Sequence, residues 1–224
     1  MNGLNRDEIL PIDPDLQILH DREYRVRAFR KDPNLLIRGS VRDQKPPGLY
    51  FGDDPNPLTI HHMQVDLEVS FPGLEIIAVQ VHFETHPNVE CPRIVDHYDK
   101  LIGLSIARGF THKVRELFGG PRGCSHTTAL LQAMAPVAVK CFWSMNASNY
   151  QQQRLLDNAP PSAAGHVTAA AQLNINSCHI WDESGDFVAG IQRGDPRPVM
   201  VFITKRLAEL ERAIDDPRNA VRVG

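Results

Sequence analysis

The chain has 224 residues, of which 42% are hydrophobic and 23% are charged, and its formal net charge is -3. This length allows one large domain or two small ones, and the composition is typical of a globular protein with a sizeable core. The weak net charge and the lack of a Lys/Arg block argue against nucleic-acid binding. No apolar run is long enough for a membrane span, and residues 1–15 lack the basic and apolar parts of a signal peptide. We therefore expect a cytoplasmic protein with no nucleic-acid or membrane partner.

The N-terminal part of the chain predicts two β-hairpins. Residues 1–22 contain two spaced prolines and predict an irregular arm. Apolar and basic residues alternate from Tyr24, and a second strand follows over residues 35–41. The segment from Asp43 to Gly48 has the composition of a turn and ends this hairpin. A clearer hairpin pairs residues 59–71 with residues 74–84 around a Pro-Gly turn.

Helical spacing replaces this alternation at Cys91. Pro92 suits the first turn of a helix, so Cys91 lies at or just before a helix start. The apolar positions, which include Tyr98, keep helical spacing until Gly109 ends the segment. A short helix over residues 111–118 follows.

A glycine-rich loop then precedes the most apolar part of the chain. Gly119-Gly120-Pro121-Arg122-Gly123 predicts a sharp turn, because glycine accepts backbone angles that other residues avoid. Residues 127–143 predict a helix, with Cys141 in the core, and residues 150–157 predict a polar helical segment. Cys124 and His126 thus lie where a loop becomes a helix, and the N–H groups and dipole of a helix start favour a thiolate.

The C-terminal part predicts a third hairpin over residues 172–192, followed by an amphipathic helix over residues 206–214. In its first strand Cys178 and His179 would point to opposite faces. Strands followed by helices favour an α+β fold, with an antiparallel sheet built from hairpins and three central helices packed on one face. We expect a single domain over residues 23–215 and a tail over residues 216–224.

The cysteines and histidines are the candidate site. In a reducing compartment the four cysteines do not form a disulfide framework, which leaves metal binding, catalysis or burial. We expect Cys91, Cys124 and His126 to share one neighbourhood, which Cys178 or His179 completes. Such ligands suit zinc or iron, while their wide spacing excludes the common structural zinc modules.

Two resemblances follow from these motifs. Over residues 24–191 the chain resembles the bacterial domain-of-unknown-function 2889 family. The motifs that carry this resemblance are, in chain order, Cys91-Pro92, Gly103, Gly119-Gly120-x-x-Gly123-Cys124-x-His126 and Asn176-x-Cys178-His179-x-Trp181. That resemblance implies no particular function, and Thr127 stands where a hydrophobe is usual, which would mark a subgroup. A weaker resemblance, to NifU/IscU-type iron–sulfur scaffold proteins, implies that Cys91, Cys124 and His126 are cluster ligands.

Three functions fit these residues. The first is a small-molecule enzyme of lyase or hydrolase type, with or without a metal, in which Cys124, His126 and His179 are catalytic. Its substrate would be held by Arg122 at the helix start and by a wall for an aromatic group, formed by Trp181, Tyr98 and Phe110. The second is an iron–sulfur or metal carrier without turnover, and the third is a partner-binding protein with structural cysteines. The sequence leaves the substrate, the metal and the formation of a homo-oligomer open.

Overall fold

The computed structural model describes residues 15–107, 109–157, 174–195 and 200–214. Most of the predicted N-terminal arm, the segment that joins residues 157 and 174, and the predicted tail lie outside these residues. Among the described helices, none is both long enough and apolar enough to cross a membrane.

Four strands form one antiparallel sheet in the order β1-β2-β3-β4. Their bounds are Asp21–Lys31 for β1, Asn34–Lys45 for β2, Leu58–Val69 for β3 and Ile76–Thr85 for β4. The two predicted N-terminal hairpins are confirmed. However, Asp43 lies within β2 and not in a turn, because it pairs with Arg22 of β1 and His61 of β3.

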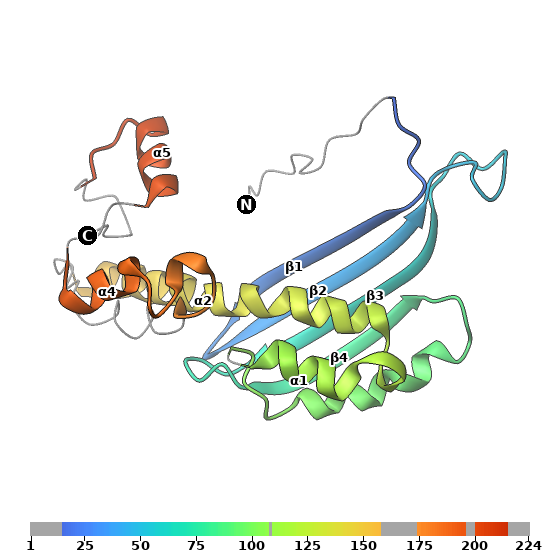
Figure 1. Cartoon of the computed structure of the whole chain (residues 1–224), viewed down its shortest axis with the longest axis horizontal. Helices are drawn as coiled ribbons and strands as arrows, with labels where there is room; N and C mark the ends of the chain where they lie inside the picture. The colour runs from blue at the N-terminus through green and yellow to red at the C-terminus, as the bar shows by residue number, and fades with distance from the viewer. Residues whose placement is uncertain (1–14, 108, 158–173, 196–199, 215–224) are drawn as a thin grey trace.

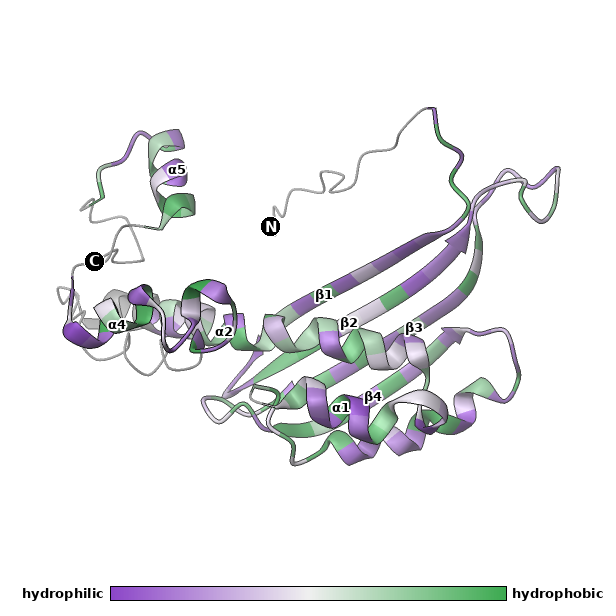
Figure 2. Ribbon diagram, viewed as in Figure 1, coloured by the Kyte–Doolittle hydropathy of each residue, from purple (hydrophilic) through white to green (hydrophobic). Residues whose placement is uncertain are grey.

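One face of the sheet carries the core. In β3 the alternate residues Met63, Val65, Leu67 and Val69 are almost completely buried, as the period-two rule for strands requires. Hydrophobic and hydrophilic residues alternate along the strands (Figure 2). The opposite face is polar and carries ion pairs such as Arg38 with Asp66.

Helices cover the apolar face, which confirms the predicted α+β architecture (Figure 1). They are the 3-10 helix η1 (Cys91–Leu101), α1 (Phe110–Phe118), the short η2 (Gly120–Arg122) and α2 (Ser125–Asp157). Helix α2 packs across β1, β2 and β3, α1 packs against α2, and η1 packs against β4. The two predicted helical segments from residue 127 to residue 157 are thus one continuous helix.

The helix that begins at Cys91 is shorter than its apolar spacing predicts. Helix η1 ends at Leu101 rather than Gly109. The reason is pairing with the sheet: Gly103 donates its N–H to the carbonyl of Ile76, whose own N–H donates to the carbonyl of Leu104.

The predicted third hairpin is wrong for the described residues 174–195. They form η3 (His179–Trp181) and the helix α4 (Asp186–Arg193). An acidic residue in the first turn, Asp186, and a left-handed glycine just after the last turn, Gly194 with φ of 78°, stabilise this helix. The last described helix is α5 (Val201–Glu209), whereas a helix over residues 206–214 was predicted. The observed helix therefore begins and ends earlier in the chain than the predicted one.

Two glycines allow close approach between the elements that carry the site. A Cβ atom at Gly39 would lie 2.7 Å from the Sδ atom of Met134, so glycine lets α2 lie close to β2. A Cβ atom at Gly123 would lie 2.6 Å from the carbonyl oxygen of Phe118. The second contact involves backbone and cannot be relieved by a side-chain rotation. Gly123 therefore holds the loop before Cys124 tightly against the end of α1.

We expect Gly123→Ala to lower the free energy of unfolding by roughly 1–3 kcal/mol, the usual cost of overpacking. Gly52→Ala is the matched control, because a Cβ atom there has no neighbour within 4 Å. Its effect should stay within about 0.5 kcal/mol. Urea denaturation of both variants measures this, and equal stabilities would show that the loop at Gly123 can move aside.

Candidate functional site

Three polar residues form a row across the inward face of the sheet, at the end where α2 begins. Arg22 of β1 pairs with Asp43 of β2, and Asp43 pairs with His61 of β3. Asp43 lies two residues beyond the buried Val41, and His61 lies two residues before the buried Met63. The alternation that builds the core therefore turns these polar side chains inward, and Asp43 is only 1% exposed.

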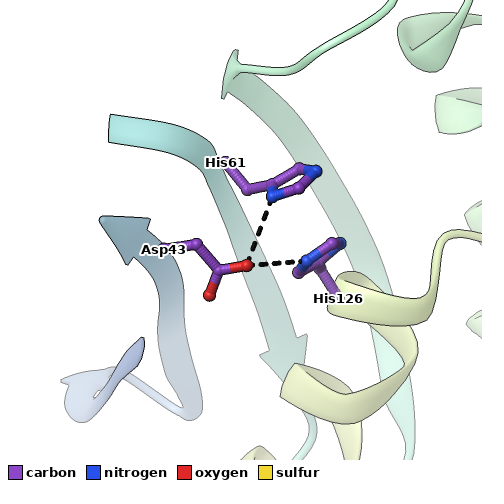
Figure 3. Close-up of side chains that lie close together, drawn as sticks. All are labelled: Asp43, His61 and His126. Carbon is purple, nitrogen blue, oxygen red and sulfur yellow. Dashed lines mark hydrogen bonds and ion pairs between the residues drawn. The ribbon is translucent and has the colours of Figure 1, made fainter. Parts of the chain in front are cut away.

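Side-chain nitrogen atoms from several elements surround the carboxylate of Asp43. Arg22 donates from Nε to Oδ1 at 2.5 Å and from Nη2 to Oδ2 at 2.6 Å. The Nε2 atom of His126, in the first turn of α2, lies 2.9 Å from Oδ2. The Nδ1 atom of His61 lies 3.2 Å from the same oxygen (Figure 3). On the other side His20 places its Nε2 atom 3.6 Å from Oδ1.

Cys124 continues this chain of contacts on the far side of His126. Its Sγ atom lies 3.8 Å from Nδ1 of His126. Cys124 precedes the first residue of α2, Ser125, so the thiol belongs to the loop and meets His126 although the two are only two residues apart. The backbone N–H of Cys124 donates to the hydroxyl of Tyr98 at 2.9 Å. The ring of His126 also stacks on His61, with centroids 3.9 Å apart.

The electrostatics favour an ionised Asp43 beside a neutral His126. Burial alone would raise the pKa of Asp43, but the hydrogen bonds and charge of Arg22, followed by those of His126, hold that pKa well below its usual range. The pKa of His126 is lowered, first by burial and then by the charge of His61, although Asp43 opposes the shift. A neutral imidazole has one nitrogen free to accept a proton or to bind a metal.

Comparison with known proteins identifies the family. A family model described as "Protein of unknown function (DUF2889)" matches residues 20–140, more than half of the chain. The chain belongs to the DUF2889 family. No curated protein and no solved structure gives a significant match. The second resemblance, to iron–sulfur scaffold proteins, is therefore not supported.

The match to DUF2889 covers the row Arg22, Asp43 and His61 as well as Cys124 and His126. It ends at residue 140, so the motif around Cys178 and His179 lies beyond it, contrary to the predicted extent. Thr127, the expected departure from the family pattern, is completely buried, so its side chain cannot itself contact a substrate.

The ligand set predicted for this DUF2889 protein does not come together. Among the described residues, the one group of three or more His, Cys, Asp or Glu whose donor atoms all lie within 4.8 Å of one another is Asp43, His61 and His126. Cys91 begins η1 as predicted and is half-buried beside the core, but it is not part of this group. Cys124 contributes only its contact with His126.

Cys178 and His179 lie beside a later part of α2. The amide of Asn174, just before them, accepts a hydrogen bond from Lys140. Lys140 is 15 residues beyond Ser125, which corresponds to roughly 22 Å along a helix axis. Cys178 is exposed, and its segment is not part of the sheet. The physical reason for this error is the missing third hairpin, which would have brought both residues onto the sheet.

The predicted substrate-binding residues do not form a wall. Tyr98 and Phe110 are core residues with 0% and 1% exposure. Trp181 packs edge-on against Phe187, with centroids 5.2 Å apart, in the η3–α4 segment. Arg122 donates to the backbone carbonyls of Glu116 and Arg115 at the end of α1. An aromatic substrate therefore has no special support, and Arg122 is occupied in holding the loop.

Sequence reasoning missed Asp43 and His61, although a signal for both exists. If the apolar alternation Leu35, Ile37, Val41 is continued by one more step, it reaches Asp43. If the alternation from Val69 back to Met63 is continued, it reaches His61. A titratable residue at the next inward position of two adjacent strands is the pattern to look for. That the two pair directly could not be known, since it depends on strand register.

The lowered pKa of His126 predicts a pH dependence of stability. Between that pKa and the ordinary histidine value of about 6.5, the unfolded chain binds a proton at residue 126 that the folded chain does not bind. Stability rises with pH wherever the unfolded state binds more protons, so it should fall as the pH is lowered from 7 to 5. His126→Gln should flatten this dependence.

Urea denaturation at a series of pH values, with a chelator present, measures the effect. The other histidines remain in both proteins, so only the difference between them reports on residue 126. If stability depends on pH equally in His126→Gln and in the wild type, the lowered pKa of His126 is contradicted.

Proposed function

We propose that this protein is a cysteine-dependent hydrolase of activated acyl compounds, in which Cys124 is the nucleophile, His126 the base and Asp43 the group that orients the base. The observation that carries the proposal is the unbroken chain of contacts between them. Sγ of Cys124 lies 3.8 Å from Nδ1 of His126, and Nε2 of the same ring lies 2.9 Å from Oδ2 of Asp43. A nucleophile, a base within reach and a third group that orients the base are the shared features of such enzymes.

The charge of Asp43 determines which nitrogen of His126 carries the proton. An ionised carboxylate only accepts hydrogen bonds, so the proton of a neutral imidazole resides on Nε2 and points at Asp43. Nδ1 is then unprotonated and faces the thiol of Cys124. Arg22 supports this arrangement because its two hydrogen bonds keep Asp43 ionised.

The start of α2 supports a thiolate at Cys124. The first N–H groups of a helix have no partner within the helix, and the helix dipole is positive at this end. Both favour the negative charge of a thiolate. The same N–H groups would stabilise the oxyanion that forms when a carbonyl is attacked. Cys124 is half-buried against the edge of the core and Ser125 beside it is exposed, so the thiol is partly accessible from the surface.

The chemistry needs no cofactor. His126 takes the proton of Cys124, and the thiolate forms a bond to the carbonyl carbon of an ester or thioester. The bond to the leaving alcohol or thiol breaks, and this group takes the proton from His126. Water, deprotonated by His126, then displaces the enzyme thiol and releases the acid. This scheme favours hydrolysis over lyase chemistry, because a lyase would not require a covalent acyl intermediate.

The other two hypotheses have less support. A metal or iron–sulfur carrier built on Cys91, Cys124, His126 and Cys178 would need these residues together, and they are dispersed over η1, the start of α2 and the η3 segment. A role in partner binding with structural cysteines does not account for a buried carboxylate beside two histidines.

Alkylation by iodoacetamide tests the reactivity of Cys124, with Cys178 as an internal reference thiol. Cys178 is exposed and Cys124 is only half-buried, so exposure alone would make Cys178 the faster of the two. We expect the opposite at pH 7, with Cys124 modified at least about tenfold faster because His126 is placed to take its proton. Mass spectrometry of the peptides gives both rates in one sample, and a faster Cys178 would contradict the proposal.

Turnover of p-nitrophenyl acetate and of an acyl thioester tests the reaction. Cys124→Ser should abolish it, while Cys178→Ser should not change it. His126→Gln should slow it by roughly 10²–10⁴-fold, the usual contribution of a positioned base, and Asp43→Asn should act in the same direction. Circular dichroism verifies that each variant is folded. Full activity in folded Cys124→Ser would refute the assignment.

A further inference from the structure

We infer that Asp43, His61 and His126 form a site for a divalent transition metal such as Zn²⁺, and that metal binding removes His126 from the thiol chemistry. The first half stands on the geometry of the three residues alone. The second half rests on the proposed function. The donor atoms come from β2, β3 and α2 and all lie within 4.8 Å of one another (Figure 3).

The distances fit a shared ion. Zinc bonds to nitrogen and oxygen are about 2.0–2.1 Å, so two ligands in tetrahedral or octahedral positions lie about 2.9–3.4 Å apart. Oδ2 of Asp43 lies 2.9 Å from Nε2 of His126 and 3.2 Å from Nδ1 of His61. Each ring nitrogen is thus spaced from the carboxylate oxygen as two ligands of one ion would be, and all three atoms lie within 4.8 Å of one another.

His61 supplies an independent observation. Its Nδ1 atom is buried and lies 3.2 Å from Oδ2 of Asp43, but this contact does not have the geometry of a hydrogen bond. A buried polar atom that makes no hydrogen bond costs about 1–3 kcal/mol, and such atoms are rare in folded proteins. A metal ion bound to the lone pair of Nδ1 would remove this cost, whereas the thiol chemistry gives His61 no role.

The donor set also indicates the kind of metal. Two imidazoles and one carboxylate suit zinc, iron and their neighbours, while magnesium and calcium prefer oxygen ligands. Arg22 competes for Oδ2 through Nη2 while its Nε atom holds Oδ1. We therefore expect monodentate binding by Asp43 and an affinity below that of a closed structural zinc site.

Metal binding and base function exclude each other because His126 has only two ring nitrogens. When Nε2 binds a metal, the proton of the neutral ring must reside on Nδ1. Nδ1 faces Sγ of Cys124, so in the metal-bound form it donates toward the thiol and cannot accept the proton of Cys124. The same ring therefore supports the thiol chemistry only while the metal is absent.

Binding of Zn²⁺ and Co²⁺ to the purified full chain tests the site. We expect one ion per chain by calorimetry, and an affinity at least tenfold lower in His61→Ala and in His61→Gln. The matched control is His62→Gln, since His62 neighbours His61 in the chain but bonds to Ser40. If His61→Ala fails to fold, the glutamine variant carries the comparison. Wild-type affinity in a folded His61 variant, or no binding to the wild type, overturns the site.

The absorption spectrum of the Co²⁺ form separates this site from a cysteine-based one. Ligands from Asp43, His61 and His126 give d–d bands without a thiolate-to-cobalt charge-transfer band, and Cys124→Ser leaves the spectrum unchanged. A charge-transfer band that disappears in Cys124→Ser would overturn the ligand set.

The rate of Cys124 alkylation with and without saturating Zn²⁺ tests the exclusion. We expect at least a tenfold slowing in the wild type and in His62→Gln, and little slowing in His61→Gln, each compared with its own metal-free rate. Slowing that persists in His61→Gln would mean that zinc binds the thiol itself and would overturn the exclusion. If Cys124 is unreactive without metal, the proposed function fails, while calorimetry still decides whether the metal site exists.

Discussion

A carboxylate on the inward face of a sheet must be neutralised, and much of this structure follows from how Asp43 meets that requirement. An ionised carboxylate removed from water is costly unless it is paired and hydrogen-bonded. Arg22 provides two hydrogen bonds, and His126 approaches from α2. These partners come from β1 and from α2, so the carboxylate joins the edge strand, the second strand and the covering helix. A one-residue slip of β1 would turn Arg22 to the outer face and leave Asp43 without its cation.

In the proposed hydrolase the same contact directs the chemistry. The carboxylate fixes the orientation of the His126 ring, and the ring in turn presents its other nitrogen to Cys124. The loop before α2 then has to bring the thiol to this nitrogen. Gly123 makes that possible, because only a residue without a side chain fits against the backbone of Phe118. Cys124 is thus placed by two features: the contact of His126 with Asp43, and the tight loop at Gly123.

Charge is distributed very unevenly over the two faces of the sheet. Polar contacts on the outer face, such as Lys31 with Glu68 and Arg38 with Asp66, are exposed ion pairs, which usually contribute little to stability. The inner face is apolar over most of its area, with Ile37, Val65 and Leu67 at 0% exposure. The polar row of Arg22, Asp43 and His61 interrupts it at the end where α2 begins. Polar groups at such a place are costly to bury, and the proposed catalysis or metal binding would explain why they are there.

Local patterns were enough to predict the two N-terminal hairpins, the helix starts at Cys91 and after Cys124, and the α+β class. They depend on period-two and helical spacing and on glycines and prolines, which act over a few residues. Local patterns were not enough for residues 174–195, where a short alternation resembled a strand while Asp186 and Gly194 favoured a helix. Only the tertiary structure decided that Asp43 faces His61, that α2 brings His126 onto both, and that Cys178 stays beside a later part of α2. Strand register and helix packing bring together residues that are far apart in the chain, and no local pattern records those contacts.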